Sequence, residues 1–280
     1  MNTILVPTDF SKSAKNALDY AIEIANATSS KLILFHAYQL PALISEGPDI
    51  PPVIEIERQI ARELKKLERY IHSTSSKKLT VEYQYRCGFP VEEIRLCSER
   101  TKADLIIMGL HGAGFVKEKL IGSVATVLIN NSKCPVMIIN QNVKFKRIKN
   151  IALAFDYTEI KNKSTLAPLN QFIQLFNSHI FIFNVVKSEL QAVSSISKAV
   201  DGMKLAHALE NAEHSFHYSE NEDIIEGINK FVSEKKIDMV VMIPHKHSPL
   251  HDLFHESETK KMAFHTRIPL LTLKELSKTN

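Results

Sequence analysis

Short apolar runs alternate along this chain with amphipathic stretches of helical period. Apolar runs lie at residues 4–6, 31–37 and 105–108, and apolar residues at helical spacing follow the first run from Ala14 to Ala25. Near-continuous apolar runs predict parallel strands buried on both faces, and the 3.6-residue period predicts helices that cover them. We therefore expect strand–helix units in an open parallel sheet.

The stretch between these units predicts a further strand and two helices. Residues 39–52 are rich in proline and glycine, which favours a surface loop, and residues 56–71 have the period of a helix with a charged outer face. Residues 81–87 alternate between apolar and polar side chains, which indicates a strand near the edge of the sheet. Pro90 suits the start of a helix over residues 91–99.

The second half of the chain repeats the order of the first. Residues 151–158 parallel 4–11, residues 179–185 parallel 31–37, residues 238–243 parallel 104–109, and residues 268–273 parallel 134–139. A shared order over the whole length indicates an internal duplication. We predict an α/β protein of two tandem, doubly wound parallel-sheet domains, 1–142 and 148–280, joined by a basic linker.

Glycines follow the apolar run at 105–108 in a spaced set. Gly109, Gly112 and Gly122 are followed by Ser123, in the order Gly-x2-Gly-x9-Gly-Ser, and Gly122-Ser123 opens a predicted helix. Glycines let backbone N–H groups approach an anion, and a helix N-terminus favours negative charge. The spacing is neither a dinucleotide fingerprint nor a Walker A loop. This stretch resembles the nucleotide-binding members of the universal stress protein family, including Cys134-Pro135 before the last apolar run.

The resemblance implies a Rossmann-like fold of the adenine-nucleotide-hydrolase type that binds ATP, ADP or AMP, with or without Mg²⁺. It implies that the two halves pair through residues 136–140 and 269–273 as an internal pseudo-dimer, and it leaves a further homodimer open. Ligands of such sheets bind beyond the carboxyl ends of the strands, where the strand order reverses. The expected nucleotide-binding residues are Pro7, Thr8, Asp9, Ala37, Met108, Gly109, His111, Gly112, Gly122, Ser123 and Val124.

Some of these residues could instead have a purely structural role. Asp9 could cap the helix that begins near Ser11, and a single glycine could serve a chain reversal with positive φ. His111 could contact a phosphate or lie exposed in its loop.

The second half departs from the motif. Asp156 is retained, but Pro244 and His247 stand where the first two glycines should be, and Glu256-Ser257 replaces Gly122-Ser123. A proline lacks the N–H donor and a glutamate repels phosphate, so we expect no nucleotide there. His247, His251 and His255 are each four residues apart and could bind zinc or nickel from one helix face, or could be solvated or interface residues.

Composition narrows the classes of function. Net charge is +4 over 280 residues, which does not favour nucleic acid as a partner. Three cysteines without a CxxC pair, no signal-like start and no long apolar run favour a cytoplasmic protein without membrane attachment. No catalytic motif is present. We therefore expect an adenine-nucleotide-binding stress-response sensor or switch; the alternatives are a slow ATPase and an interaction module that binds no nucleotide.

Overall fold

The computed structural model describes residues 1–40, 52–110, 123–155, 160, 162–186, 205, 208, 209, 212–243 and 268–274. Its first half contains β1 (Thr3–Pro7), α1 (Lys12–Thr28), β2 (Lys31–Tyr38), α2 (Val53–Thr74), β3 (Val81–Cys87), α3 (Pro90–Arg100), β4 (Leu105–Gly109), α4 (Ser123–Asn131) and β5 (Val136–Ile139). Its second half contains β6 (Asn150–Ala154), η1 (Lys163–Leu166), α5 (Ala167–Phe176), β7 (His179–Val186), β8 (His214–Glu220), α8 (Ile224–Glu234), β9 (Met239–Met242) and β10 (Leu270–Thr272).

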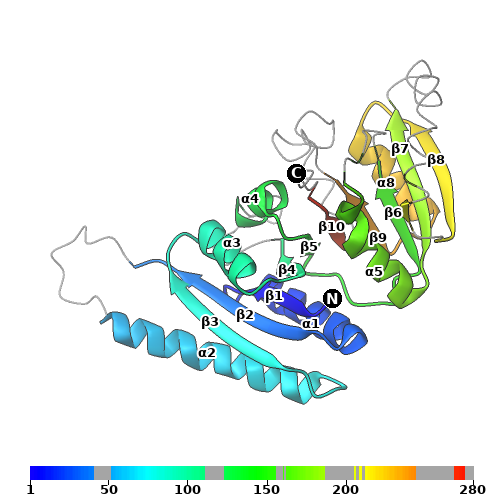
Figure 1. The fold of residues 1–280 in the computed structure, drawn as a ribbon. Helices are drawn as coiled ribbons and strands as arrows, with labels where there is room; N and C mark the ends of the chain where they lie inside the picture. Colours follow the sequence, from blue (N-terminus) through cyan, green and yellow to red (C-terminus); the bar gives the residue numbers. More distant parts are fainter. Residues whose placement is uncertain are drawn as a thin grey trace.

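All ten described strands form one sheet in the order β3-β2-β1-β4-β5-β10-β9-β6-β7-β8. Strands within each half are parallel, whereas β5 and β10 pair antiparallel where the halves meet (Figure 1). The pairing expected between residues 136–140 and 269–273 is therefore present. The chain thus has the expected fold of two tandem, doubly wound halves, with the alternating strand β3 at one edge.

Corresponding strands of the two halves have the same register. Ile4 pairs with Leu32 and Leu105, and its counterpart Ile151 pairs with Ile180 and Met239. The aspartates before β4 and β9 also share a role. Asp104 Oδ2 accepts hydrogen bonds from the backbone N–H groups of residues 2 and 3, and Asp238 Oδ2 accepts them from residues 149 and 150. The repeat therefore extends to side-chain contacts.

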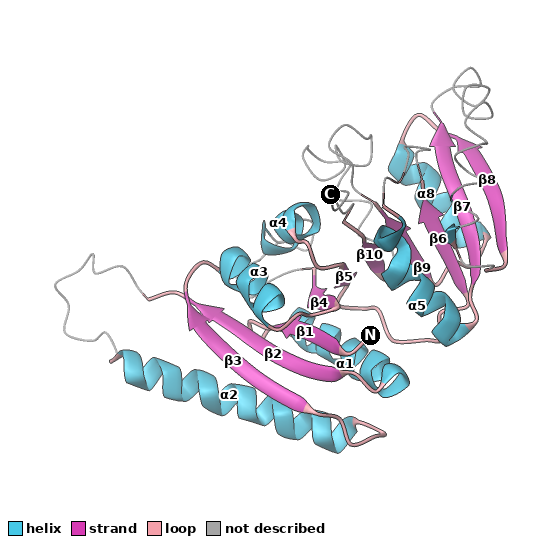
Figure 2. Ribbon diagram, in the orientation of Figure 1, coloured by secondary structure: helices cyan, strands magenta, loops and turns pink. Residues whose placement is uncertain are grey.

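Helices cover both faces of the sheet (Figure 2). One buried cluster joins the strands to α1, α2 and α5, and the other joins them to α3, α4 and α8. Alternate residues of a single strand enter different clusters: Ile4 and Val6 belong to the first and Leu5 to the second. Both clusters contain residues of both halves, so each core continues across the seam between β5 and β10. Among the described residues, no helix is long and apolar enough to cross a membrane.

Candidate functional site

The strand order of the first half reverses between β1 and β4, which are direct neighbours. In doubly wound sheets the loops that leave the carboxyl ends of two such strands diverge and leave a crevice between them. Residues 7–9 leave β1 here and Gly109 ends β4. The structure thus brings together two of the sequence elements expected to form the nucleotide site.

Asp9 stabilises the turn that leads from β1 into α1. Its Oδ1 accepts a hydrogen bond from the N–H of Ser11 at 3.1 Å, and the Ser11 hydroxyl in turn accepts from the N–H of Ala14 at 3.1 Å. Ser11 is therefore the N-cap residue of α1, a role that contributes about 1 kcal/mol. The alternative in which Asp9 itself caps the helix is wrong, because Asp9 holds the turn before the cap.

Thr8 is fixed by a histidine that the sequence analysis did not single out. The Nδ1–H of His36 donates to the Thr8 carbonyl at 2.7 Å, and the Thr8 N–H donates to the Phe35 carbonyl at 2.8 Å. The bond from His36 requires its Nδ1-protonated form, because a carbonyl can only accept. It joins the end of β2 to the first residue beyond β1, and no sequence motif marks it.

Phe10 has a left-handed backbone, with φ of 64°, which is rare for a residue with a large side chain. Its ring lies 4.7 Å from the His36 ring between centroids and is 37% exposed. The Thr8 hydroxyl accepts a hydrogen bond from the Phe10 N–H at 3.0 Å and helps to hold this conformation. Phe10 and His36 thus form a partly exposed aromatic pair beyond the carboxyl end of β1. Strained backbone of this kind concentrates at functional sites.

Gly109 is required by close packing. A Cβ atom at this position would lie 2.4 Å from the Ser13 hydroxyl oxygen and 2.8 Å from the Ser13 carbonyl carbon. Among the described residues, the only glycine with positive φ is Gly88. The chain-reversal explanation is therefore wrong for Gly109, where β4 ends directly against the first turn of α1.

The other predicted residues that the structure describes lie at or near the ends of β1, β2 and β4 and at the start of α4. Pro7 is buried at the end of β1, Ala37 is half-buried near the end of β2, and Met108 is 7% exposed in β4. Ser123 begins α4, and the half-buried Val124 packs against the core on that face. Three predicted residues, His111, Gly112 and Gly122, lie outside the described residues.

The second half repeats the strand pair of the site, with β6 beside β9. The register places Ile243, a side chain only 2% exposed, at the position of Gly109, so the assignment of Pro244 to that position is wrong by one residue. Asp156, Pro244, Glu256 and Ser257 lie outside the described residues, as do the metal candidates His247, His251 and His255. Within the described ranges, no group of three or more His, Cys, Asp or Glu side chains could hold a metal ion.

Comparisons with known proteins show which family the first half of the chain matches. Residues 1–140 match the universal stress protein family. The universal stress protein MJ0531 of Methanocaldococcus jannaschii is 29% identical over 147 residues, which cover 50% of this chain and 83% of the relative. YxiE of Bacillus subtilis, another universal stress protein, is 28% identical over 145 residues, covering 49% of this chain and 98% of the relative.

A solved structure matches the whole architecture. A universal stress protein from Archaeoglobus fulgidus superposes with a TM-score of 0.74 over 98% of this chain and 99% of its own, at 19% identity. That likeness shows the fold of both halves together. The match of residues 1–140 shows the family.

Proposed function

This chain belongs to the universal stress protein family, and from that premise we propose that its first half binds an adenine nucleotide, ATP, ADP or AMP. One observation carries the proposal. Asp9 and Gly109 flank the point where the strand order reverses, and the spaced glycines and Ser123 lead from Gly109 into α4. The corresponding reversal of the second half, between β6 and β9, has no glycine in the sequence that follows β9.

The proposed roles follow from position and chemistry. The Asp9 carboxylate is suited to a ribose hydroxyl, and backbone groups of Pro7 and Thr8 and the small Ala37 side chain would border the nucleoside. Backbone N–H groups of Gly109 and Gly112 would hold the phosphates, together with those of residues 122–124, which are free to bind an anion at the N-terminus of α4. Mg²⁺ would accompany a triphosphate.

The second half would then be a partner without nucleotide. Ile243 stands where the first half has Gly109, and Pro244 after it has no N–H to donate. Glu256 stands where the first half has Gly122, and a glutamate repels phosphate. We propose that the two halves are domains of residues 1–142 and 148–280, that the protein is cytoplasmic, and that nucleotide occupancy acts as a stress-response switch.

The test is mass spectrometry of small molecules that co-purify with the full chain. We expect about one adenine nucleotide per chain in the parent protein, because only one half retains the motif. Gly122→Glu, which copies the second half, and Asp9→Asn should lose it. The internal repeat offers a matched control, since Asp156→Asn alters the counterpart of Asp9 and should retain the nucleotide.

Two outcomes would favour a different function. If the parent carries no nucleotide and binds none in millimolar ATP, the glycine loop is structural and the protein is an interaction module. If the parent releases phosphate over multiple turnovers and Asp9→Asn does not, the site is that of an ATPase.

A further inference from the structure

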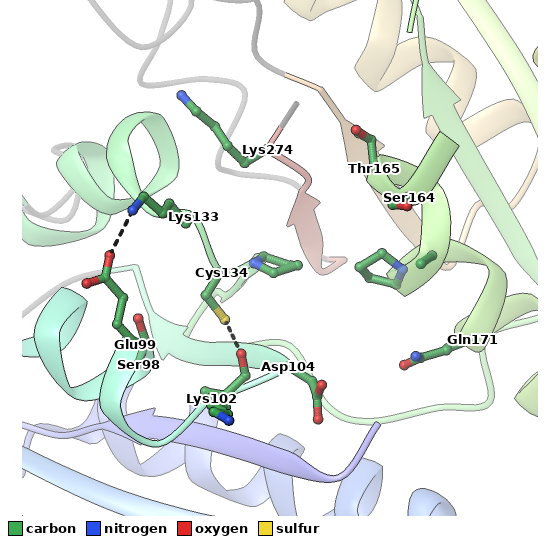
Figure 3. A pocket seen from close by; sticks show the side chains of 14 residues that line it. Ser98, Glu99, Lys102, Asp104, Lys133, Cys134, Ser164, Thr165, Gln171 and Lys274 are labelled. Carbon is green, nitrogen blue, oxygen red and sulfur yellow. Dashed lines mark hydrogen bonds and ion pairs between the residues drawn. The ribbon is translucent and has the colours of Figure 1, made fainter. Parts of the chain in front are cut away.

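A cavity of about 370 Å³ lies on the seam between the two halves (Figure 3). The first half contributes residues at the end of α3 and before β4 and β5, and the second half contributes η1, the start of α5, and Lys274 after β10. This position is at the amino ends of β4 and β5, whereas the proposed nucleotide site is at the carboxyl end of β4. The cavity is therefore a separate site, and its volume is in the range of small-molecule pockets.

The carboxylates of the cavity already have partners. Glu99 Oε1 lies 3.0 Å from Arg95 Nη1 and 3.5 Å from Lys133 Nζ. Asp104 Oδ2 accepts hydrogen bonds from the backbone N–H groups of residues 2 and 3, at 2.6 and 2.9 Å. Neither carboxylate is therefore set up to receive a cation in the cavity.

Two ammonium groups of the cavity have no carboxylate partner within the described part of the chain. Lys102 follows α3 with a left-handed backbone, φ of 49°, and forms no ion pair there. Lys274 Nζ donates to the Asn130 carbonyl at 2.8 Å, which positions the group without neutralising it. Figure 3 shows Lys274 and Lys102 on opposite sides of the cavity. Over the whole lining, three lysines, Lys102, Lys133 and Lys274, face two carboxylates, Glu99 and Asp104, so the cavity has a net charge of +1.

The lining also contains apolar groups. Pro135 comes from the first half and Pro168 from the second. The Cys134 thiol donates to the Ala103 carbonyl at 3.1 Å, and burial raises its pKa to about 12, so it adds no charge. Ser164 and Gln171 contribute a hydroxyl and an amide from the second half.

We propose that this seam cavity binds a small phosphorylated metabolite with an anionic group at each end, such as a sugar bisphosphate. One phosphate lies against Lys102 and the other against Lys274, because an ammonium group is a point charge suited to phosphate. The carbon body of the ligand lies over the two prolines. Since both halves supply the lining, the bound ligand bridges them.

Isothermal titration calorimetry of the full chain with fructose 1,6-bisphosphate tests the proposal. All titrations use the Gly122→Glu background, which removes the proposed phosphate loop of the first half from the measurement. We expect one site per chain, with fructose 6-phosphate binding at least about tenfold more weakly because it lacks one charged end.

Ala167 provides a matched pair of variants. It is exposed at the start of α5 and lines the cavity, and a glutamate is compatible with the first turn of a helix. Ala167→Glu should weaken bisphosphate binding at least about tenfold, whereas the neutral Ala167→Gln should change it less than about threefold. Lys102→Gln with Lys274→Gln should weaken it similarly, and the exposed Lys65→Gln on α2 should not.

Two results would overturn the proposal. One is the absence of bisphosphate binding at millimolar concentration. The other is binding that is equal in Ala167→Glu and Ala167→Gln, which would place the ligand elsewhere. Both results are independent of nucleotide binding in the first half.

Discussion

Gly109 shows how a single residue can serve packing and ligand binding together. The end of β4 approaches α1 so closely that even a methyl group at this position would overlap the Ser13 backbone. The same approach brings the start of the glycine loop next to the Asp9 turn. Absence of a side chain is therefore needed here whether or not a phosphate binds.

Gly109→Ala should therefore destabilise the protein without any ligand present. We expect a loss of about 1–3 kcal/mol in the free energy of unfolding, because inserting a methyl group into a filled space forces the backbone to shift. Urea denaturation of nucleotide-free protein measures it. Unchanged stability, with nucleotide binding alone reduced, would show that the packing explanation is incorrect.

The sequence did not reveal the other residues that shape this turn. The Asp9 turn is local, and its residue types are visible in the sequence. The bond from His36 to Thr8 and the left-handed Phe10 depend on β2 lying beside β1, so no local pattern predicts them. The chain-reversal alternative for Gly109 was wrong, because a close approach between distant segments leaves the same glycine in the sequence as a positive φ does.

At the scale of elements, the central strands were predictable because parallel strands buried on both faces are apolar throughout. The edge strand β8 was not predicted, because exposed and half-buried positions alternate along it and few of its residues are apolar. Helix α2 and the edge strand β3 were likewise visible from their periods. The short η1 and the way it leads into α5 were not foreseen, since a 3₁₀ turn has no strong pattern of its own.

The outer pair of strands in the second half carries a group that responds to pH. The ring of His217 on β8 packs against the rings of Phe181 on β7 and Phe231 on α8. The hydroxyl of Ser215 lies 2.9 Å from Nε2 of His217 and 2.9 Å from Nε2 of His179 on β7. Burial lowers the pKa of His217 below its ordinary value of 6.5, and the positive charges of Lys235 and His179 lower it further.

Stability should therefore fall as the pH decreases from about 7.5 to 5.5. The unfolded chain protonates His217 near its ordinary pKa, whereas the folded state resists protonation until the pH is lower, so acid favours unfolding. Thermal unfolding of the parent and His217→Gln measures this, and the variant should show a smaller decrease in Tm. His214→Gln, on the same strand, is the control, and an equal decrease in all three proteins would rule out the assignment to His217.

At the scale of the whole molecule, the seam determines which strand edges remain open. β5 and β10 pair with each other, so neither strand has a free edge. The buried Thr272 hydroxyl adds a hydrogen bond to the Val136 carbonyl at 3.1 Å. Only β3 and β8 are edges among the described strands. An association of two chains through β5 or β10 would have to break this pairing.

We therefore expect one chain per particle in dilute solution. Size-exclusion chromatography with light scattering should give a mass near 31.7 kDa. A mass twice as large would mean that two chains meet through another surface.

Leu271→Pro interrupts β10 between its two neighbouring strands, β5 and β9. Because β10 joins the two halves of the sheet, this substitution should lower the free energy of unfolding by about 3 kcal/mol or more.

The antiparallel seam also bears on how a repeated protein can change over evolutionary time. Because the strands of one half run opposite to those of the other, their carboxyl-terminal loops emerge at opposite rims of the sheet. Substitutions that remove the motif from one rim leave the other rim untouched, while both cores stay under common selection for packing. An antiparallel seam therefore lets substitutions accumulate in the loops of one rim without disturbing the loops of the other.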